Sequence, residues 1–136
     1  MSLTITPDIH HTFLSSQAKE FRTTYSIGNS TGREPQTKQK NLIVEEFKEF
    51  LEADGELWRD SLEVNADCLK ELADLVYVCY QYAENMGWNL DEALHRVHTS
   101  NMSKLDEDGN PIYREDGKVL KGPNYKEPDL IDLVVS

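Results

Sequence analysis

Acidic residues recur at helical spacing in two short stretches of the chain, and this spacing could hold a cation. Positions 45–49 read Glu-Glu-Phe-Lys-Glu and positions 71–74 read Glu-Leu-Ala-Asp. Side chains three residues apart on a helix face the same way and lie about 4.5 Å apart along its axis. Two such pairs on neighbouring antiparallel helices would form a cluster of four carboxylates: Glu46, Glu49, Glu71 and Asp74. A cluster of oxygen ligands without cysteine or histidine favours Mg²⁺ or Mn²⁺ over Zn²⁺.

The position of each acid around its helix separates candidate ligands from surface acids. With the apolar residue Ile43 set to zero, Glu46 and Glu49 fall at about −60° and −120°, which adjoins the apolar face. Glu45 and Glu52 fall near the opposite side of the helix and should face water. We therefore expect the pair formed by Glu46 and Glu49 to be at least partly buried.

The second pair of acids interrupts residues 66–85, a stretch that is apolar almost all round. A buried carboxylate without a partner costs several kcal/mol, so Glu71 and Asp74 should contact cations or strong hydrogen-bond donors. A metal cluster is the leading interpretation. The alternative is a buried salt-bridge network in which lysine or arginine neutralises the two acids.

A di-iron site is a further interpretation, because Glu92 and His95 have the Glu-x-x-His spacing of di-iron carboxylate bundles. Such bundles need two of these motifs. The matching position on the stretch 66–85 is Asp74 instead of histidine, so the sequence favours magnesium or manganese over iron.

The elements that would position these side chains are helical. Apolar residues recur at helical spacing in four stretches, and Met86-Gly87 and Asn89 read as the end of the third stretch and the cap of the fourth. The predicted helices span about residues 7–22, 37–53, 66–85 and 89–104. The third is apolar on nearly every side, which is typical of a helix at the centre of a bundle.

The pattern changes after residue 104. Two short runs, 111–114 and 118–121, flank a Glu-Asp-Gly turn and predict a small β-hairpin. Residues 126–136 predict a tail that docks through its apolar side chains. The predicted fold is an all-α bundle of four to five helices with a small C-terminal β-hairpin. The predicted boundaries are 1–136 for a single domain, about 7–104 for its helical body and about 105–136 for the hairpin and tail.

Length and charge exclude several functions. A chain of 136 residues is typical of one domain. Its 14 basic and 25 acidic residues give a net charge of −11, which argues against nucleic acid or an anionic membrane as partner. A phosphate-bearing small molecule stays compatible with this charge when metal ions or a few cations offset the carboxylates. The chain shows no secretory signal and no bilayer-spanning run, so we expect a cytoplasmic location, in the host if a phage encodes the protein.

Taken together, the motifs resemble those of the MazG-like all-α nucleoside triphosphate pyrophosphohydrolases. The acidic patterns match the Glu-Glu-x-x-Glu and Glu-x-x-Asp signature of this group, and Asn101-Met102-Ser103-Lys104 resembles the end of its fourth helix. Residues 106–125 look like the hairpin of short, phage-type, single-domain MazG proteins. The resemblance covers most of the chain, from about Gln39 to Leu133.

The resemblance implies hydrolysis of a nucleoside triphosphate to the monophosphate and pyrophosphate, with water attacking the α-phosphorus. It implies Mg²⁺, or Mn²⁺ as a substitute, with two or more ions per site. The implied metal ligands are Glu46, Glu49, Glu71 and Asp74. Glu45 matches the remaining motif position and would support catalysis by orienting a water or by making a subunit contact. Lys104 would act in catalysis and bind phosphate, and Asn101 would bind phosphate or sugar.

The resemblance also implies a homo-oligomer, either a dimer or a tetramer. Among substrates, dGTP is our first candidate and dCTP or dUTP follow. The alternative function is that of a catalytically weak regulatory or interaction protein that retains the MazG-like fold.

Overall fold

The regular structure of this protein is helical. The computed structural model describes residues 7–57 and 61–134, with side chains from residue 14 onward, and contains no strand within these ranges. This result confirms the predicted all-α fold class. None of the described helices has the length and apolarity needed to cross a membrane. The chain divides into two compact units, Met1–Trp88 and Asn89–Ser136, which we treat in turn.

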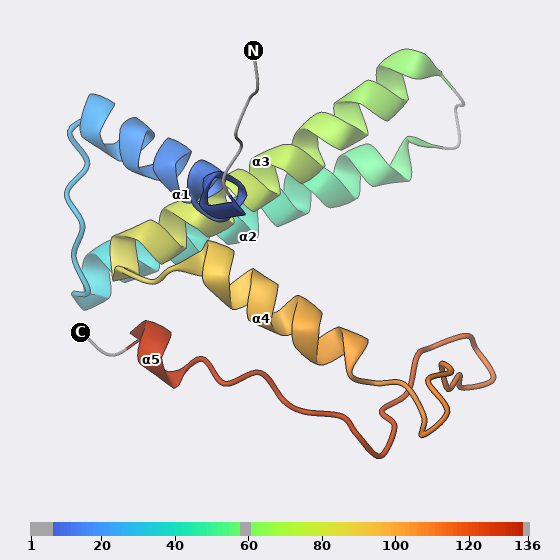
Figure 1. The fold of residues 1–136 in the computed structure, drawn as a ribbon. Helices are drawn as coiled ribbons and strands as arrows, with labels where there is room; N and C mark the ends of the chain where they lie inside the picture. The colour runs from blue at the N-terminus through green and yellow to red at the C-terminus, as the bar shows by residue number, and fades with distance from the viewer. Residues whose placement is uncertain (1–6, 58–60, 135–136) are drawn as a thin grey trace, which may run out of the picture. The chain divides into compact units, whose positions relative to one another are not determined.

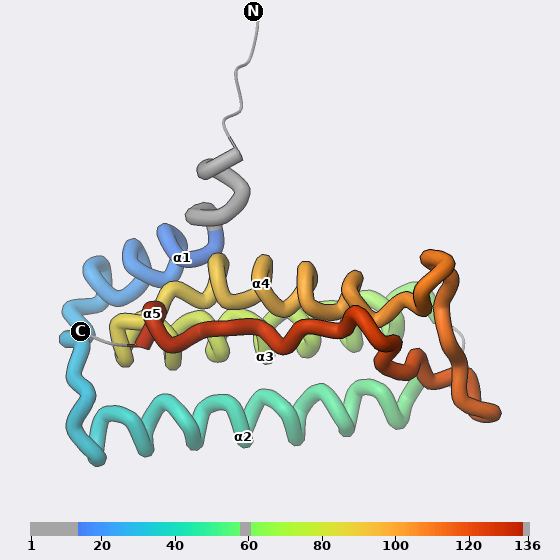
Figure 2. The backbone as a smooth tube through the Cα atoms, turned by 60° about the horizontal axis from the view of Figure 1, so that its bottom comes forward, coloured from blue at the N-terminus to red at the C-terminus, as the bar shows by residue number. Residues whose placement is uncertain are grey.

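Three helices build the first unit, and two of them form an antiparallel hairpin (Figure 1). They are α1 (Pro7–Thr24), α2 (Arg33–Gly55) and α3 (Leu62–Met86). α2 and α3 lie side by side along their length, and α1 packs against α3 (Figures 1 and 2). The hairpin is the arrangement that allows acids on two helices to meet.

Local signals set the ends of α3. The Ser61 hydroxyl accepts a hydrogen bond from the Val64 amide at 3.1 Å, which satisfies one of the free N–H groups at the start of the helix. Gly87 ends the helix with φ at 76°, a left-handed conformation that glycine adopts without steric cost. The predicted end at Met86-Gly87 is therefore confirmed.

A buried arginine fastens the loop between α1 and α2 onto α3. Arg22 is only 3% exposed. Its guanidinium donates to Gly28 O at 3.1 Å, Asn29 Oδ1 at 2.6 Å, Gln81 Oε1 at 3.3 Å and Asn85 Oδ1 at 3.1 Å. Asn85 extends this network, since it accepts from Ser30 N at 3.0 Å and donates to Ser30 O at 2.9 Å. The loop thus has a defined path over the end of the hairpin.

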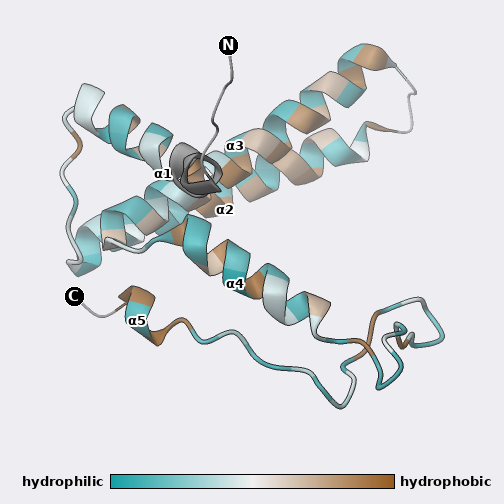
Figure 3. Cartoon of the chain, viewed as in Figure 1, coloured by the Kyte–Doolittle hydropathy of each residue, from teal (hydrophilic) through white to brown (hydrophobic). Residues whose placement is uncertain are grey.

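The apolar core of the first unit is small. The buried apolar residues in the described part of the chain are Ala18, Cys68, Tyr80 and Ala83. Larger apolar side chains along the hairpin remain exposed, and Figure 3 shows hydrophobic segments on both of its helices. These exposed residues include Leu42, Val44, Phe47, Leu51, Leu69, Leu72 and Val76. Although α3 packs against α1 and α2, one of its apolar sides stays open, so it does not occupy the predicted bundle centre within this unit.

The second unit consists of α4 (Leu90–Met102), a returning tail and the short α5 (Ile131–Val134). Asn89 caps α4 as predicted, because its side chain accepts from the Glu92 amide at 3.0 Å. The tail runs back along α4 (Figure 1). Ser100 Oγ donates to Lys126 O at 2.6 Å, and Arg96 donates to Asp129 O at 2.9 Å and to Asp132 Oδ1 at 2.6 Å. The predicted docking tail is therefore held by these polar contacts, and of its apolar residues Leu130 and Leu133 are half-buried while Ile131 is exposed.

The prediction of a small C-terminal β-hairpin was wrong. Only one antiparallel bridge forms in this segment, between Tyr113 and Val119, and Leu120 N donates to Ile112 O at 2.8 Å beside it. Both bridge residues are exposed, and Ile112 and Leu120 beside them are only half-buried, so the segment lacks a fully buried apolar face. An isolated two-stranded ribbon without such a face is marginally stable, and this explains why no continuous ladder forms here.

Candidate active site

Three glutamates from two helices converge in the first unit. Glu46 and Glu49 stand three residues apart on α2, and Glu71 stands on α3. One carboxylate oxygen from each lies within 4.8 Å of the others. We call these residues the glutamate cluster. Their spacing along α2 and the antiparallel path of α3 together produce it, as the sequence pattern predicts.

Two oxygens of the glutamate cluster are buried without a hydrogen-bond partner. They are Oε2 of Glu46 and Oε2 of Glu71. A buried carboxylate oxygen without a donor is costly, whereas a divalent cation would satisfy both oxygens at once. The donor set contains only carboxylate oxygens, so it suits a hard cation such as Mg²⁺ or Mn²⁺.

Electrostatics oppose the charge of Glu46. Burial raises the pKa of Glu46, and a hydrogen bond with Glu49 and the negative charges of the neighbouring acids raise it further. The neighbours that contribute are Glu49, Asp74 and Glu71. The acids of the glutamate cluster therefore repel one another, and a bound cation would relieve this repulsion.

Asp74, the fourth predicted ligand, lies outside the glutamate cluster and pairs with a lysine. Lys70 Nζ lies 2.9 Å from Asp74 Oδ2 and 3.2 Å from Glu71 Oε1. The hydrogen bonds to these two carboxylates raise the pKa of Lys70 well above its usual range. Features of both sequence interpretations are thus present, because the acids converge as a metal cluster would and a lysine also neutralises two of them.

The exposure of the acids on α2 agrees with the helical wheel except at one position. Glu45 and Glu52 are exposed, as expected, and Glu46 is half-buried. Glu49 is exposed, although we expected it to be partly buried with Glu46. Its place about 60° further round the helix explains the difference, since that angle turns it farther from the apolar face.

The two remaining candidates belong to the second unit. Asn101 is exposed in the last turn of α4, and Lys104 is half-buried just beyond the helix. The backbone of Lys104 is held on both sides, because its N–H donates to Asn101 O at 3.3 Å and its carbonyl accepts from Gly122 N at 2.9 Å. Their roles toward phosphate remain predictions.

Sequence reasoning missed two polar residues of the hairpin. It did not identify Lys70 as an ion-pair partner, although Lys70 precedes Asp74 by four residues, a spacing that favours such pairs on a helix. It also missed Gln39, which is buried on α2 with Oε1 unpartnered. A single glutamine on a helix gives no sequence signal for burial.

A comparison with protein families identifies the fold's relatives. The family described as phosphoribosyl-ATP pyrophosphohydrolase matches residues 6–101. The chain belongs to this family. The matched segment includes both acidic patterns and Asn101, but it ends before Lys104. Among curated proteins, no match to the chain is found.

Membership in the phosphoribosyl-ATP pyrophosphohydrolase family gives the general activity. This is a helical pyrophosphohydrolase family within the MazG-like superfamily, so the chain is a pyrophosphohydrolase for a nucleotide-like substrate. The sequence-based prediction of a MazG-like relative is confirmed at this level, whereas the narrower assignment to MazG itself is not established by the match.

Proposed function

We propose that this pyrophosphohydrolase is a short, phage-type MazG protein that cleaves a (deoxy)nucleoside triphosphate, with dGTP as the first candidate. The products would be the monophosphate and pyrophosphate, formed by attack of water on the α-phosphorus. The observation that carries the proposal is the convergence of Glu46, Glu49 and Glu71, in which two buried oxygens lack a protein partner.

In this proposal the acids of the hairpin hold divalent cations. Glu46, Glu49 and Glu71 would be ligands, and Asp74 would join them once it separates from Lys70. Bound Mg²⁺, two or more ions per site with Mn²⁺ as a substitute, would neutralise the triphosphate and lower the pKa of a bound water. Glu45, exposed beside Glu46 on α2, would orient the attacking water.

Two residues at the end of α4 and just beyond it would bind the phosphates. Lys104 would pair with phosphate oxygens as a point charge, and Asn101 would donate a hydrogen bond to phosphate or sugar. A chain with a net charge of −11 repels a triphosphate, so a positioned lysine would matter for binding and orientation.

Two alternatives compete with dGTP hydrolysis. Phosphoribosyl-ATP is a candidate substrate because the family match carries its name. A regulatory protein that retains the fold without efficient catalysis is the other alternative. The intact glutamate cluster favours an enzyme, since its two buried carboxylate oxygens without a partner are costly unless a bound cation satisfies them.

Release of pyrophosphate tests the proposal. The full chain would be incubated with each canonical dNTP and NTP and with phosphoribosyl-ATP, in Mg²⁺ or in excess chelator. We expect the fastest release from dGTP with Mg²⁺ and none with chelator. In ¹⁸O-labelled water the label should appear in dGMP, because the α-phosphorus is attacked.

Several results would contradict different parts of the proposal. Label in pyrophosphate, or orthophosphate as the first product, would exclude attack at the α-phosphorus. Full activity in chelator would exclude the metal. Preference for phosphoribosyl-ATP would replace dGTP as the substrate, and no turnover of any substrate would support the regulatory alternative.

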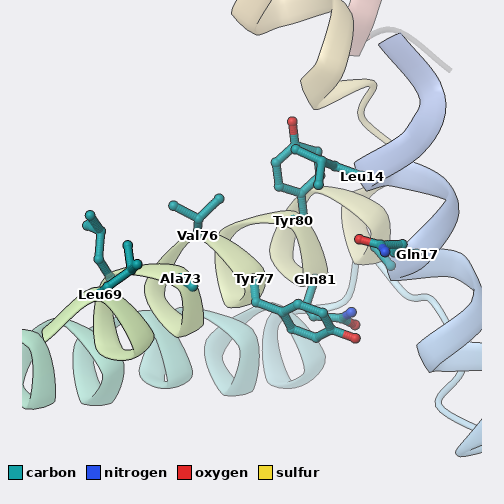
Figure 4. Close-up of a pocket in the computed structure, with 10 residues that line it drawn as sticks. Leu14, Gln17, Leu69, Ala73, Val76, Tyr77, Tyr80 and Gln81 are labelled. Atoms are coloured by element: carbon teal, nitrogen blue, oxygen red, sulfur yellow. The ribbon is translucent and has the colours of Figure 1, made fainter. Parts of the chain in front are cut away.

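We further propose that the protein forms a homo-oligomer, a dimer or a tetramer, through the open apolar side of the hairpin. An apolar cavity of about 420 Å³ lies between α1 and α3, and Figure 4 shows the side chains around it. Leu14, Leu69, Val76, Tyr77 and Tyr80 are among its lining residues. A second copy suits this surface because the described part of one copy buries too few apolar residues to form a full core.

A further inference from the structure

Lys70 occupies a distinctive position at the edge of the glutamate cluster. Its ammonium lies 3.2 Å from Glu71 Oε1 and 2.9 Å from Asp74 Oδ2. Among the ion pairs between described residues, these two are the ones that involve a predicted metal ligand. One cation of the chain therefore neutralises part of the site.

The two oxygens of Glu71 have different environments. Oε1 contacts Lys70, whereas Oε2 is buried and has no partner in the described structure. Glu71 is also the member of the glutamate cluster contributed by α3. A cation bound by Glu46, Glu49 and Glu71 would thus share one carboxylate with the ammonium of Lys70. Two positive charges on one carboxylate repel each other and compete for it.

The ion pairs between Lys70 and the two acids can break without a change in the backbone. The Lys70 side chain is 65% exposed, while that of Asp74 is 40% exposed. An exposed ion pair is weak because water screens it, and the four-carbon stem of lysine can move its charged end without moving the backbone. The helix can therefore stay in place while the ammonium leaves.

We propose that Lys70 is a resident counter-ion of the site, which neutralises Glu71 and Asp74 in the metal-free protein and which a divalent cation must displace. This inference rests on the proposed function, since it requires that the glutamate cluster binds a metal. Lys70 would then have two effects: it stabilises the metal-free hairpin and it weakens metal binding. It would set the concentration of Mg²⁺ at which Asp74 becomes available as a ligand.

Calorimetric titration with Mg²⁺ tests the proposal directly. The proteins compared would be the full-length wild type, Lys70→Met and Lys48→Met. Lys48 lies between Glu46 and Glu49 in the sequence and is exposed, and the structure gives it no ion pair with another described residue, so its replacement removes the same charge without breaking a contact. An exposed ion pair contributes a factor of about two to five, so loss of two should tighten Mg²⁺ binding by roughly four- to 25-fold in Lys70→Met. Lys48→Met should change it by less than about two-fold.

Thermal unfolding provides a readout that is independent of turnover. In chelator, Lys70→Met should melt below the wild type, because Glu71 and Asp74 lose their counter-ion. The rise in melting temperature on adding Mg²⁺ should be larger for Lys70→Met than for the wild type. Lys70→Arg keeps the charge and should bind Mg²⁺ no more tightly than the wild type, which provides a second variant if Lys70→Met folds poorly.

The outcomes separate this inference from the proposed function. If the wild type binds Mg²⁺ and Lys70→Met binds it no more tightly than Lys48→Met, Lys70 is an ordinary surface lysine and only this inference fails. If the wild type binds no Mg²⁺, the metal dependence of the proposed function fails and the inference falls with it. Tighter binding in Lys70→Met, with wild-type affinity in Lys70→Arg, would support the counter-ion.

Discussion

Glu46 is the residue whose surroundings most clearly oppose its ionised form. One of its oxygens is buried without a partner, and three nearby acids add to the effect of burial in raising its pKa. An acid whose pKa is higher in the folded than in the unfolded state destabilises the fold once it ionises. In the metal-free protein this carboxylate therefore lowers stability at neutral pH.

Replacing Glu46 should separate stability from activity. Glu46→Gln keeps the size of the side chain and removes its charge, so in chelator at pH 7 we expect a melting temperature about 2–5 °C above the wild type. Pyrophosphate release should fall by about 100-fold or more, because a metal contact is lost.

The pH dependence of this variant gives a further check. The metal-free wild type should lose stability as the pH rises from the usual glutamate pKa of 4.5 through the raised one, and Glu46→Gln should lack this component. Melts followed by circular dichroism between pH 4 and 8 would measure both proteins. Lower helicity in Glu46→Gln at neutral pH would show that the acid supports the fold instead.

The spacing of the acids predicts much of the candidate site, but only what helical geometry controls. It correctly brings together Glu46, Glu49 and Glu71. The contact of Asp74 with Lys70 depends on which way two exposed side chains turn, and periodicity carries no information on that. The exposure of Glu49 follows from its angle farther from the apolar face of α2, and the sequence-based expectation drew the edge of the buried face too wide.

At the scale of elements, apolar periodicity places four helices correctly and their ends less well. The predicted third helix, 66–85, is extended by one turn in the structure because Ser61 caps α3 at Leu62. The prediction of a β-hairpin was wrong because its residues lack a surface that would bury them fully. The network around Arg22 could not be foreseen, because it joins residues that lie about 60 positions apart in the sequence.

Arg22→Met should loosen the connection between α1 and α2. The substitution removes the guanidinium donor from buried Gln81 Oε1 and one of the two donors to Asn85 Oδ1, and we expect a loss of about 2–3 kcal/mol in the free energy of unfolding. Arg33→Met, at an exposed position at the start of α2, is the matched control and should change stability by less than about 0.5 kcal/mol. Urea denaturation would measure both variants. Equal effects would show that the network adds no stability.

At the scale of the whole molecule, we expect the open apolar side of the hairpin to govern assembly. Leu69 is 66% exposed, and Leu72 and Val76 are more than 40% exposed on the same helix. A stable interface buries about 800 Å² on each partner, and residues of this kind form the centre of such surfaces. A pattern of apolar residues cannot distinguish burial within one copy from burial between two, so the sequence alone does not say what covers the apolar sides of α3.

A polar substitution at this surface should change the oligomeric state. Val76→Lys should convert the wild-type dimer or tetramer to a smaller species in analytical ultracentrifugation, because a charge buried between copies is costly. Tyr113→Lys, at an exposed aromatic residue of the second unit, should leave the assembly unchanged. A wild type that sediments as a monomer at micromolar concentration would refute the proposed assembly.

The hydrogen bonds between α4 and the tail, which we call the clasp, affect how the chain folds during its synthesis. Arg96, Ser100 and Ser103 leave the ribosome before their partners at Lys126, Asp129 and Asp132, which follow 23–36 residues later. Both helices of the α2–α3 hairpin, by contrast, have been synthesised once the chain reaches residue 86. Since chains fold from the N-terminal side during synthesis, the acids of the glutamate cluster would meet early, while the polar face of α4 would still be solvated. A premature stop within residues 105–125 would therefore yield a chain with the glutamate cluster assembled and α4 without its clasp.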